Sequence, residues 1–356
     1  MKLPERYRVL QVLGEGATCE VVLAEDRARQ ESVALKIVRA NLALHDRFRV
    51  RFAREVSLLA NVAHPHIVPV HDLGILDDGR PFVSMAYADQ GSFGDLLRTR
   101  PPIVTVLKII DQVLDALACL HARGLVHQDL KPDNVLLRKT DDGGVMAWVA
   151  DLGVAGARAE LGMEGRSGLP GTPLWMAPEQ LHGSVAELGP WTDLYSVGLM
   201  LYEVLGGEPP VEESRAKLLK YRTAGVPEMP WEMPDAVCHV VSNLLDPEPC
   251  QRYDRAADVR RALAAVTQEL NPDQPAQSVF VDFGSEEPRP MGTTTTFPDV
   301  ILAEAQEPLT VPSHESVDPM SVPRWNRVAP GLFPDEPPED SENRIDPNGL
   351  SLLPFR

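Results

Sequence analysis

The sequence has no apolar run of about 18 residues, the length that a helix needs to span a bilayer. Its first residues, 1–6, also lack the apolar core of a secretory signal peptide. We therefore expect a soluble, cytoplasmic protein without a membrane span.

Cysteine is scarce, and the four cysteines form no C-x-x-C pair. This pattern excludes a zinc ribbon and a disulfide framework, and it fits a reducing cytosol. Basic residues are also few, since 34 Lys and Arg stand against 52 Asp and Glu, for a formal net charge of -18. Nucleic acids and anionic lipids reward clustered basic residues, so this net charge argues against either as the main partner.

The composition changes near residue 270. Residues 271–356 contain 15 prolines, 15 acidic residues, five arginines and no lysine. No apolar periodicity survives that much proline, so we predict a disordered acidic tail over 269–356. The rest of the chain has the length of one folded domain of about 260 residues.

One stretch of eight residues, 127–134, is unusually rich in chemically capable side chains: His-Gln-Asp-Leu-Lys-Pro-Asp-Asn. It lies between the apolar runs 125–126 and 135–137, which we interpret as two short strands flanking a loop.

Phosphoryl transfer requires an acceptor for the hydroxyl proton, metal ligands, and fixed positive charge on the phosphates. Asp129, Asn134 and Lys131 can supply one of each. The alternative is a polar turn in which Asp133 and Asn134 bond their own backbone.

This octapeptide resembles the catalytic loop of eukaryotic-type Ser/Thr protein kinases, and the chain is similar to the bacterial branch of that family over roughly residues 7–268. The resemblance implies a two-lobed α+β fold. Its N-lobe, 1–88, has a small antiparallel sheet and one helix, and its larger C-lobe, 89–268, is mainly helical. The resemblance also implies that Asp129 takes the hydroxyl proton and that Lys131 neutralises the γ-phosphate.

Apolar alternation predicts three N-lobe strands, over 7–13, 20–24 and 32–38. The turn between the first two contains Gly14 and Gly16, whose backbone amides can approach phosphate oxygens. Cys19 replaces the third glycine of the family pattern. An ordinary hairpin turn is the alternative interpretation.

Lys36 lies in the third predicted strand, and a helix is predicted over 46–62 because apolar residues recur there at spacings of four, four and three. By resemblance, Lys36 grips the α and β phosphates, and Glu55 of this helix holds Lys36. A solvated glutamate on an amphipathic helix is the alternative.

Residues 82–88 are expected to end a strand. The resemblance implies that this end is the hinge, where backbone groups of Ala86 and Ala88 bond adenine and Met85 gates the pocket behind it. The side chains of Val21, Ala34 and Leu136 sandwich the base in this reading. The residues that the resemblance assigns to ATP are Leu13, Gly14, Gly16, Val21, Ala34, Lys36, Met85, Ala86, Ala88 and Leu136.

Apolar residues at helical spacing predict a helix over 106–120 that packs inside the C-lobe. A strand is predicted over 145–150, and Asp151 follows it directly. The resemblance implies that Asp151 and Asn134 hold Mg²⁺. A turn-forming aspartate before glycine is the alternative.

Residues 171–179 (Gly-Thr-Pro-Leu-Trp-Met-Ala-Pro-Glu) form a second specific motif. By resemblance, Thr172 bonds Asp129 and Lys131, and Glu179 pairs with Arg252. The stretch 193–205 is apolar nearly all round, which predicts a buried helix.

These motifs predict an ATP- and Mg²⁺-dependent protein kinase that acts on Ser or Thr. Two alternatives stay open. The first is a small-molecule phosphotransferase, against which Lys131 and the segment 172–179 argue, because they resemble a docking ledge for peptide. A pseudokinase scaffold is motivated by Cys19 and by Gln128, where most relatives have arginine.

Gln128 and Cys19 also bear on regulation. A neutral amide cannot bind a phosphorylated loop as arginine does, and Ser167 and Thr172 are the only hydroxyl side chains between 151 and 179. We therefore expect activity that does not depend on phosphorylation of that loop. The Cys19 thiol is expected either to be accessible to oxidants or to be a small residue tolerated in place of glycine.

Four threonines, Thr293–Thr296, interrupt the acidic tail. A tethered segment meets its own active site at high effective concentration, which favours autophosphorylation. Asp299 follows Thr296 by three residues, a spacing that resembles ligands of forkhead-associated domains. A spacer without a reader is the alternative.

Overall fold

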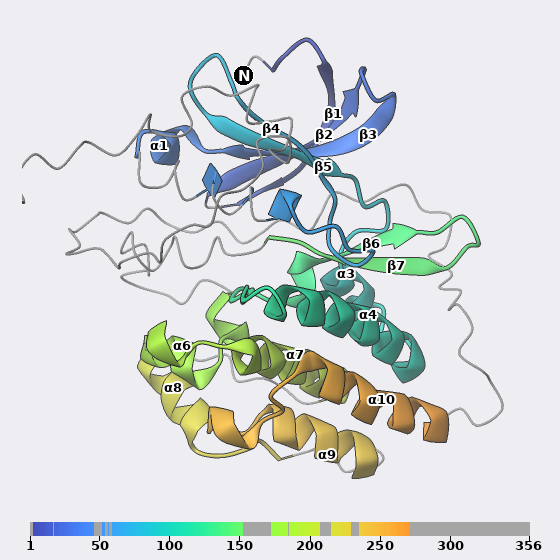
Figure 1. The fold of residues 1–356 in the computed structure, drawn as a ribbon, viewed down its shortest axis with the longest axis vertical. Coiled ribbons are helices and arrows are strands. Elements are labelled where there is room, and N and C mark those ends of the chain that lie inside the picture. The colour runs from blue at the N-terminus through green and yellow to red at the C-terminus, as the bar shows by residue number, and fades with distance from the viewer. Residues whose placement is uncertain are drawn as a thin grey trace, which may run out of the picture.

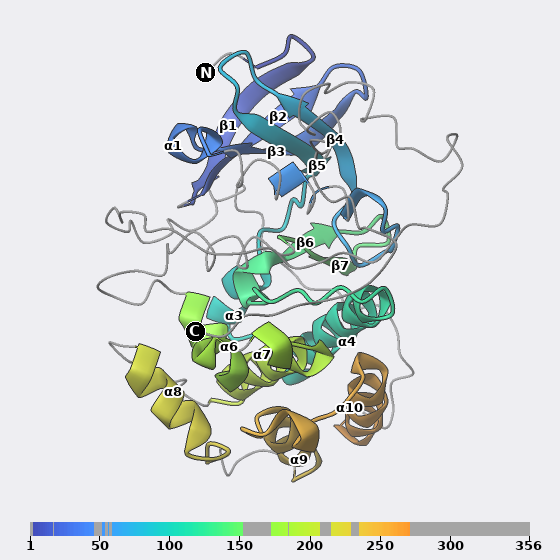
Figure 2. The ribbon, with the colours of Figure 1, turned by 60° about the vertical axis from the view of Figure 1, so that its left-hand side comes forward.

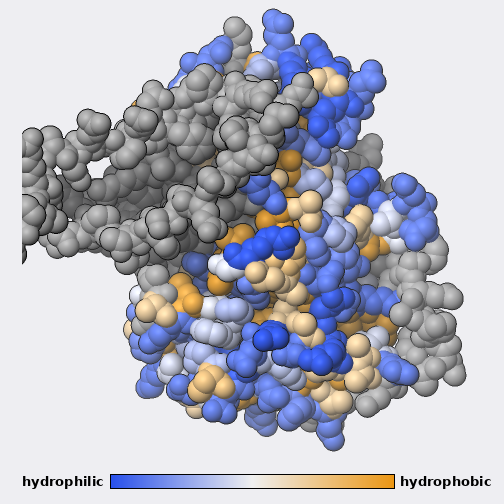
Figure 3. Space-filling view, viewed as in Figure 1, coloured by the Kyte–Doolittle hydropathy of each residue, from blue (hydrophilic) through white to orange (hydrophobic). Residues whose placement is uncertain are grey.

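The computed structural model describes residues 3–16, 18–45, 52–53, 56, 59–151, 172–183, 185–206, 215–228 and 235–270. They form a sheet-built N-lobe above a helical C-lobe, so the predicted two-lobed α+β fold is confirmed (Figure 1). On the face shown in Figure 3, most of the described surface is hydrophilic. Glu55, residues 152–171, the side chain of Thr172 and the chain from residue 271 onward lie outside the described residues.

The N-lobe sheet has five antiparallel strands in the order β1-β2-β3-β5-β4. These strands are β1 (Tyr7–Glu15), β2 (Cys19–Asp26), β3 (Glu31–Val38), β4 (Val70–Ile75) and β5 (Pro81–Ala86). The first three contain the predicted segments and extend them by one or two residues at their ends.

Strand β3 lies in the middle of this sheet, and its residues from Val33 to Val38 are all buried. Successive side chains of a strand point to opposite faces. Accordingly, Leu35 packs in one hydrophobic cluster, whereas Ala34 and Val38 pack in another. Lys36 shares the face of Ala34, so this face is the one that meets the candidate site. A short helix that was not predicted, α1 (Ala40–Ala43), follows β3.

The C-lobe core is built on two long helices, and both confirm predictions. The apolar stripe of α4 is buried, and every residue of α7 from Thr192 to Tyr202 is buried. The C-lobe helices are α3 (Phe93–Arg98), α4 (Ile103–His121), α6 (Pro178–His182), α7 (Pro190–Val204), α8 (Arg215–Thr223), α9 (Asp235–Leu244) and α10 (Ala256–Leu270). The last helix, α10, ends two residues after the predicted end of the C-lobe at 268.

A two-stranded sheet of β6 (Val135–Lys139) and β7 (Val145–Val149) lies between the N-lobe sheet and α4 (Figure 2). Two strands were predicted to flank the catalytic loop. The one after the loop is β6, but Leu125-Val126 before the loop is not a strand, so that prediction was wrong. The chain turns after α4, and Leu125 donates its N–H to Leu120. The N–H groups of His127 and Gln128 donate to the side chain of Asp193 instead of to a neighbouring strand.

Candidate active site

The predicted loop brings three of its polar side chains together. Asp129 is buried, and its Oδ2 lies 3.6 Å from Nζ of Lys131. The Nδ2 of Asn134 donates to the backbone oxygen of Asp129 at 2.7 Å and lies 3.3 Å from its Oδ2. A carboxylate, a cation and an amide therefore share one small volume, with the carboxylate fixed in position.

Asp193, at the start of α7, holds this loop from below. Its carboxylate accepts the N–H groups of His127 and Gln128, both at 2.8 Å, and its Oδ2 lies 2.7 Å from Nε2 of His121. No role was assigned to Asp193 from the sequence. Its place at the start of an otherwise apolar helix could have indicated one, because a buried carboxylate needs partners.

His127 joins the loop to the strand that precedes Asp151. It is fully buried, and its Nε2 lies 2.9 Å from the carbonyl oxygen of Ala150. Ala150 in turn donates its N–H to the carbonyl of Asn134 at 2.9 Å. These bonds place the two predicted metal ligands, Asn134 and Asp151, on adjacent backbone segments.

Asp151 and Lys36 form an ion pair between the lobes, with Nζ 2.6 Å from Oδ1. Asp151 has a φ of +62°, an uncommon value for a residue other than glycine. Burial disfavours the ammonium of Lys36, but neighbouring acidic groups, led by the Asp151 carboxylate, together raise the pKa of Lys36. Burial likewise opposes ionisation of Asp151, but neighbouring cationic groups, led by Lys36, together hold the pKa of Asp151 below its usual value. Both groups are charged at neutral pH.

The donor atoms here fit Mg²⁺. A carboxylate and an amide oxygen are hard oxygen ligands of the kind that Mg²⁺ prefers. The amide nitrogen of Asn134 faces Asp129, which leaves its amide oxygen for a cation. Asp151 is partly exposed, with 37% of its side chain accessible. A bound Mg²⁺ supplies charge neutralisation and orients phosphate oxygens.

The apolar residues predicted to enclose adenine lie in one hydrophobic cluster. This cluster contains Leu13, Ala34 and Met85 as buried members, and Val21, Ala86, Ala88 and Leu136 pack against it.

Strand β5 ends at Ala86, two residues before the predicted end, and the hinge begins there. The N–H of Ala86 donates to Pro69 at 2.9 Å, so only its carbonyl can face a ligand. Within the described part of the chain, no backbone hydrogen bond uses the N–H of Ala88. The carbonyl of Ala86 and the N–H of Ala88 belong to the two hinge residues whose backbone groups the family resemblance assigned to adenine.

The glycine-containing turn is closed by its own backbone. Gly16 donates its N–H to Cys19 at 2.8 Å, and its carbonyl accepts from Nε of Arg39 at 2.6 Å. Cys19 is only 3% exposed, because it pairs with Val38 in the sheet and its side chain packs in the hydrophobic cluster around Ala34. The expectation that its thiol is accessible to oxidants was therefore wrong, and the small-residue interpretation fits.

Glu179 and Arg252 form the predicted pair, with Nη1 to Oε1 at 2.9 Å and Nη2 to Oε2 at 3.0 Å. The predicted contacts of Glu55 and of the Thr172 side chain lie outside the part of the chain that the structure describes.

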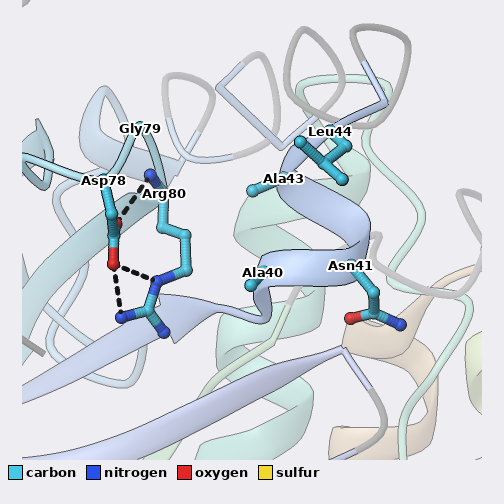
Figure 4. Close-up of a pocket in the computed structure, with 7 residues that line it drawn as sticks. All are labelled: Ala40, Asn41, Ala43, Leu44, Asp78, Gly79 and Arg80. Atoms are coloured by element: carbon cyan, nitrogen blue, oxygen red, sulfur yellow. Dashed lines mark hydrogen bonds and ion pairs between the residues drawn. The ribbon is translucent and has the colours of Figure 1, made fainter.

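A separate cavity lies between α1 and the turn that joins β4 to β5 (Figure 4). It is lined by Ala40, Asn41, Ala43, Leu44, Asp78, Gly79 and Arg80. None of these residues belongs to the candidate active site.

Comparisons with known proteins agree with this geometry. The family model described as "Protein kinase domain" matches residues 7–262. Serine/threonine-protein kinase PknB of Mycolicibacterium smegmatis is 33% identical over 285 residues, which cover 77% of this chain and 45% of PknB. Serine/threonine-protein kinase PknD of Mycobacterium tuberculosis is 32% identical over 267 residues, which cover 73% of this chain and 39% of PknD. The chain thus spans less than half the length of these relatives.

Among solved structures, the PknI kinase domain of Mycobacterium tuberculosis superposes with a TM-score of 0.54 at 27% identity, covering 73% of this chain and 96% of that domain. The fold, the paired loop motifs and the family match agree. The chain belongs to the protein kinase domain family.

Proposed function

We propose that this chain is a protein kinase that transfers the γ-phosphate of ATP to Ser or Thr of other proteins, with Mg²⁺ as its cofactor. The carrying observation is the convergence of Lys36, Asp129, Asn134 and Asp151 from three separate segments between the two lobes. The Ser/Thr specificity of PknB and PknD supports the acceptor class.

In this proposal, Asp129 accepts the proton of the substrate hydroxyl, and Lys131 neutralises the transferred phosphate. Lys36 binds the α and β phosphates, and Asn134 and Asp151 bind Mg²⁺. The apolar cluster around Ala34 and Met85 encloses adenine. Glu55 and Thr172 keep the supporting roles that the family resemblance implies.

The proposal extends to organisation and partners. The N-lobe occupies 1–88, the C-lobe occupies 89–268, and an acidic tail follows. Thr293–Thr296 of the tail is an autophosphorylation site read by a forkhead-associated domain. A cytoplasmic location follows from the use of ATP. In the described part of the chain, no helix is long and apolar enough to cross a membrane.

The test is transfer of labelled phosphate from Mg-ATP to the chain itself or to a generic basic protein. Lys36→Ala and Asp129→Asn should each abolish transfer. Asp78→Asn removes an exposed carboxylate far from the loop and should keep it. Equal labelling by the native chain and by Asp129→Asn would favour a scaffold, and transfer to small hydroxyl compounds alone would favour a small-molecule phosphotransferase.

A further inference from the structure

The backbone just before Asp129 is held in an uncommon conformation. Gln128 has a φ of +65°, in the left-handed region that a residue with a Cβ adopts only at a free-energy cost. Such a conformation persists where the surroundings fix it. The position of Asp129, the proposed proton acceptor, therefore depends on the groups that hold Gln128 in this conformation.

Two side chains hold Gln128, one on each side. Oδ1 of Asp193 accepts its N–H at 2.8 Å, and Nε2 of Gln180 donates to its carbonyl oxygen at 2.7 Å. Asp193 comes from the buried helix α7, whereas Gln180 comes from α6, the helix that follows the 172–177 segment. The second bond therefore ties α6, which directly follows that segment, to the catalytic loop.

The chemistry at position 180 requires an amide. Oε1 of Gln180 accepts the N–H of Ala177 at 3.0 Å, which is a capping bond that glutamate makes equally well. An amide can accept there and also donate to the carbonyl of Gln128, whereas an ionised glutamate can only accept. The two partners together fix which end of the amide points where. The donor function, and not capping, distinguishes glutamine from glutamate here.

We propose that Gln180 is a positioning residue that holds Asp129 in place by fixing the carbonyl of Gln128. The inference rests on the proposed phosphotransfer, because a fixed Asp129 matters for rate only in that reaction. The bond uses neutral groups alone, so it couples α6 to the catalytic loop without a phosphate on the chain.

Gln180→Glu tests this bond, because the carboxylate keeps the capping bond to Ala177 but has no N–H to donate to the carbonyl of Gln128. We expect kcat to fall about tenfold at neutral pH, since small displacements of a reacting group cost rates of that order. The KM for ATP should stay within about twofold, because the nucleotide groups are untouched. The activity relative to the native chain should recover as pH falls, because a protonated glutamate donates again.

Gln112→Glu is the matched control. The Gln112 amide also bridges two backbone groups, accepting from Ala147 at 2.7 Å and donating to Val145 at 3.4 Å. Gln112→Glu therefore makes the same chemical change away from the catalytic loop. It should leave kcat within about twofold of native. A kcat for Gln180→Glu that matches this control, or an activity ratio that does not change with pH, overturns the proposal.

Amide hydrogen exchange gives a readout that needs no activity. Loss of the bond should speed exchange in peptides covering residues 125–131 in Gln180→Glu and leave it unchanged in Gln112→Glu. Unchanged exchange in both overturns the proposal, even if the native chain transfers no phosphate. If Gln180→Glu does not fold, Gln180→Met replaces it, and the same loss of kcat and faster exchange are expected without recovery at low pH.

Discussion

Glu179 and Arg252 lie 73 residues apart in the sequence and form a doubly hydrogen-bonded ion pair inside the C-lobe. Their side chains are 2% and 0% exposed, respectively. The hydroxyl of Thr192 donates to the same carboxylate at 2.9 Å, and the guanidinium lies 4.6 Å from the ring centre of Tyr195. The pair thus anchors the start of α6 to α7 and to the segment before α10.

Removal of one member of this pair should strongly destabilise the C-lobe. Arg252→Met leaves a buried carboxylate without its cation, which typically costs about 3 to 5 kcal/mol of unfolding free energy. The double variant Glu179→Gln/Arg252→Met should cost less than the sum of the single variants, because no charge is then left alone. Urea unfolding of the four proteins measures this coupling.

Arg261→Met is the control for this cycle, because Arg261 also pairs with an aspartate but is 80% exposed. It should change the stability little, as is usual for surface ion pairs. Strict additivity of the Glu179 and Arg252 changes would contradict the interpretation of a coupled buried pair.

Two contacts of the site region were predicted, on different grounds. The meeting of Asp129 with Asn134 follows from their places in one short loop, whereas the Glu179–Arg252 pair was an expectation from the family resemblance of two distant motifs. The roles of Asp193 and Gln180 could not be predicted, because each bonds backbone groups of a distant loop and only the tertiary structure brings them there. Residue type can indicate that a buried carboxylate such as Asp193 needs partners, but it does not identify them.

Local patterns also failed where tertiary contacts override them. The apolar pair at 125–126 read as a strand, yet the N–H groups that follow it find a carboxylate instead of a neighbouring strand. Cys19 looked like the tip of a turn, yet the β2–β3 ladder includes it and buries its side chain. Both errors follow from partners far along the chain.

The buried state of Cys19 predicts a slow thiol reaction. In the folded protein, maleimide should label the exposed Cys250 much faster than Cys19, because the reagent cannot reach a thiol that is 3% exposed. Mass spectrometry of tryptic peptides after timed labelling measures both rates. In urea the two rates should converge. Rapid native labelling of Cys19 would mean that the turn opens readily.

Two partly buried histidines predict a loss of stability on mild acidification. Burial lowers the pKa of His66 below its ordinary value of 6.5 against the opposing effect of the Ala147 carbonyl, and burial followed by Arg29 lowers that of His71. Because the pKa of each histidine is lower in the folded chain than in the unfolded chain, the unfolded chain takes up protons at a higher pH. The stabilisation is therefore present above about pH 6.5 and is lost as pH falls through the folded-state values.

Unfolding of the native chain and of His66→Gln/His71→Gln at several pH values between about 7.5 and 5.5 tests this expectation. The stability of the native chain should fall more steeply with acid, by at most about 1.4 kcal/mol per pH unit for each histidine. His239→Gln, at an exposed position, should keep the native slope. Equal slopes for native and double-variant proteins would remove both histidines from the explanation.

Gln128 predicts that the proposed phosphotransfer does not need a phosphate on the loop between Asp151 and Glu179. The neutral side chain of Gln128 cannot form the charge-assisted bonds that hold a phosphorylated loop. Ser167→Ala and phosphatase-treated protein should therefore keep their rate of substrate phosphorylation within about threefold of native. A loss of about tenfold in either sample would show that a phosphate controls the site.

The last prediction concerns Thr293–Thr296, which we propose as the autophosphorylation site of the tail. Tethering raises the effective concentration of these threonines at the active site, so phosphorylation there should not depend on protein dilution. Mass spectrometry after incubation with Mg-ATP should find phosphate on this tract in the native chain and none in Asp129→Asn. Replacement of all four threonines by alanine should remove that phosphate without changing the rate on an added substrate. Phosphate found elsewhere in the chain but not on this tract would leave the tail as a passive linker.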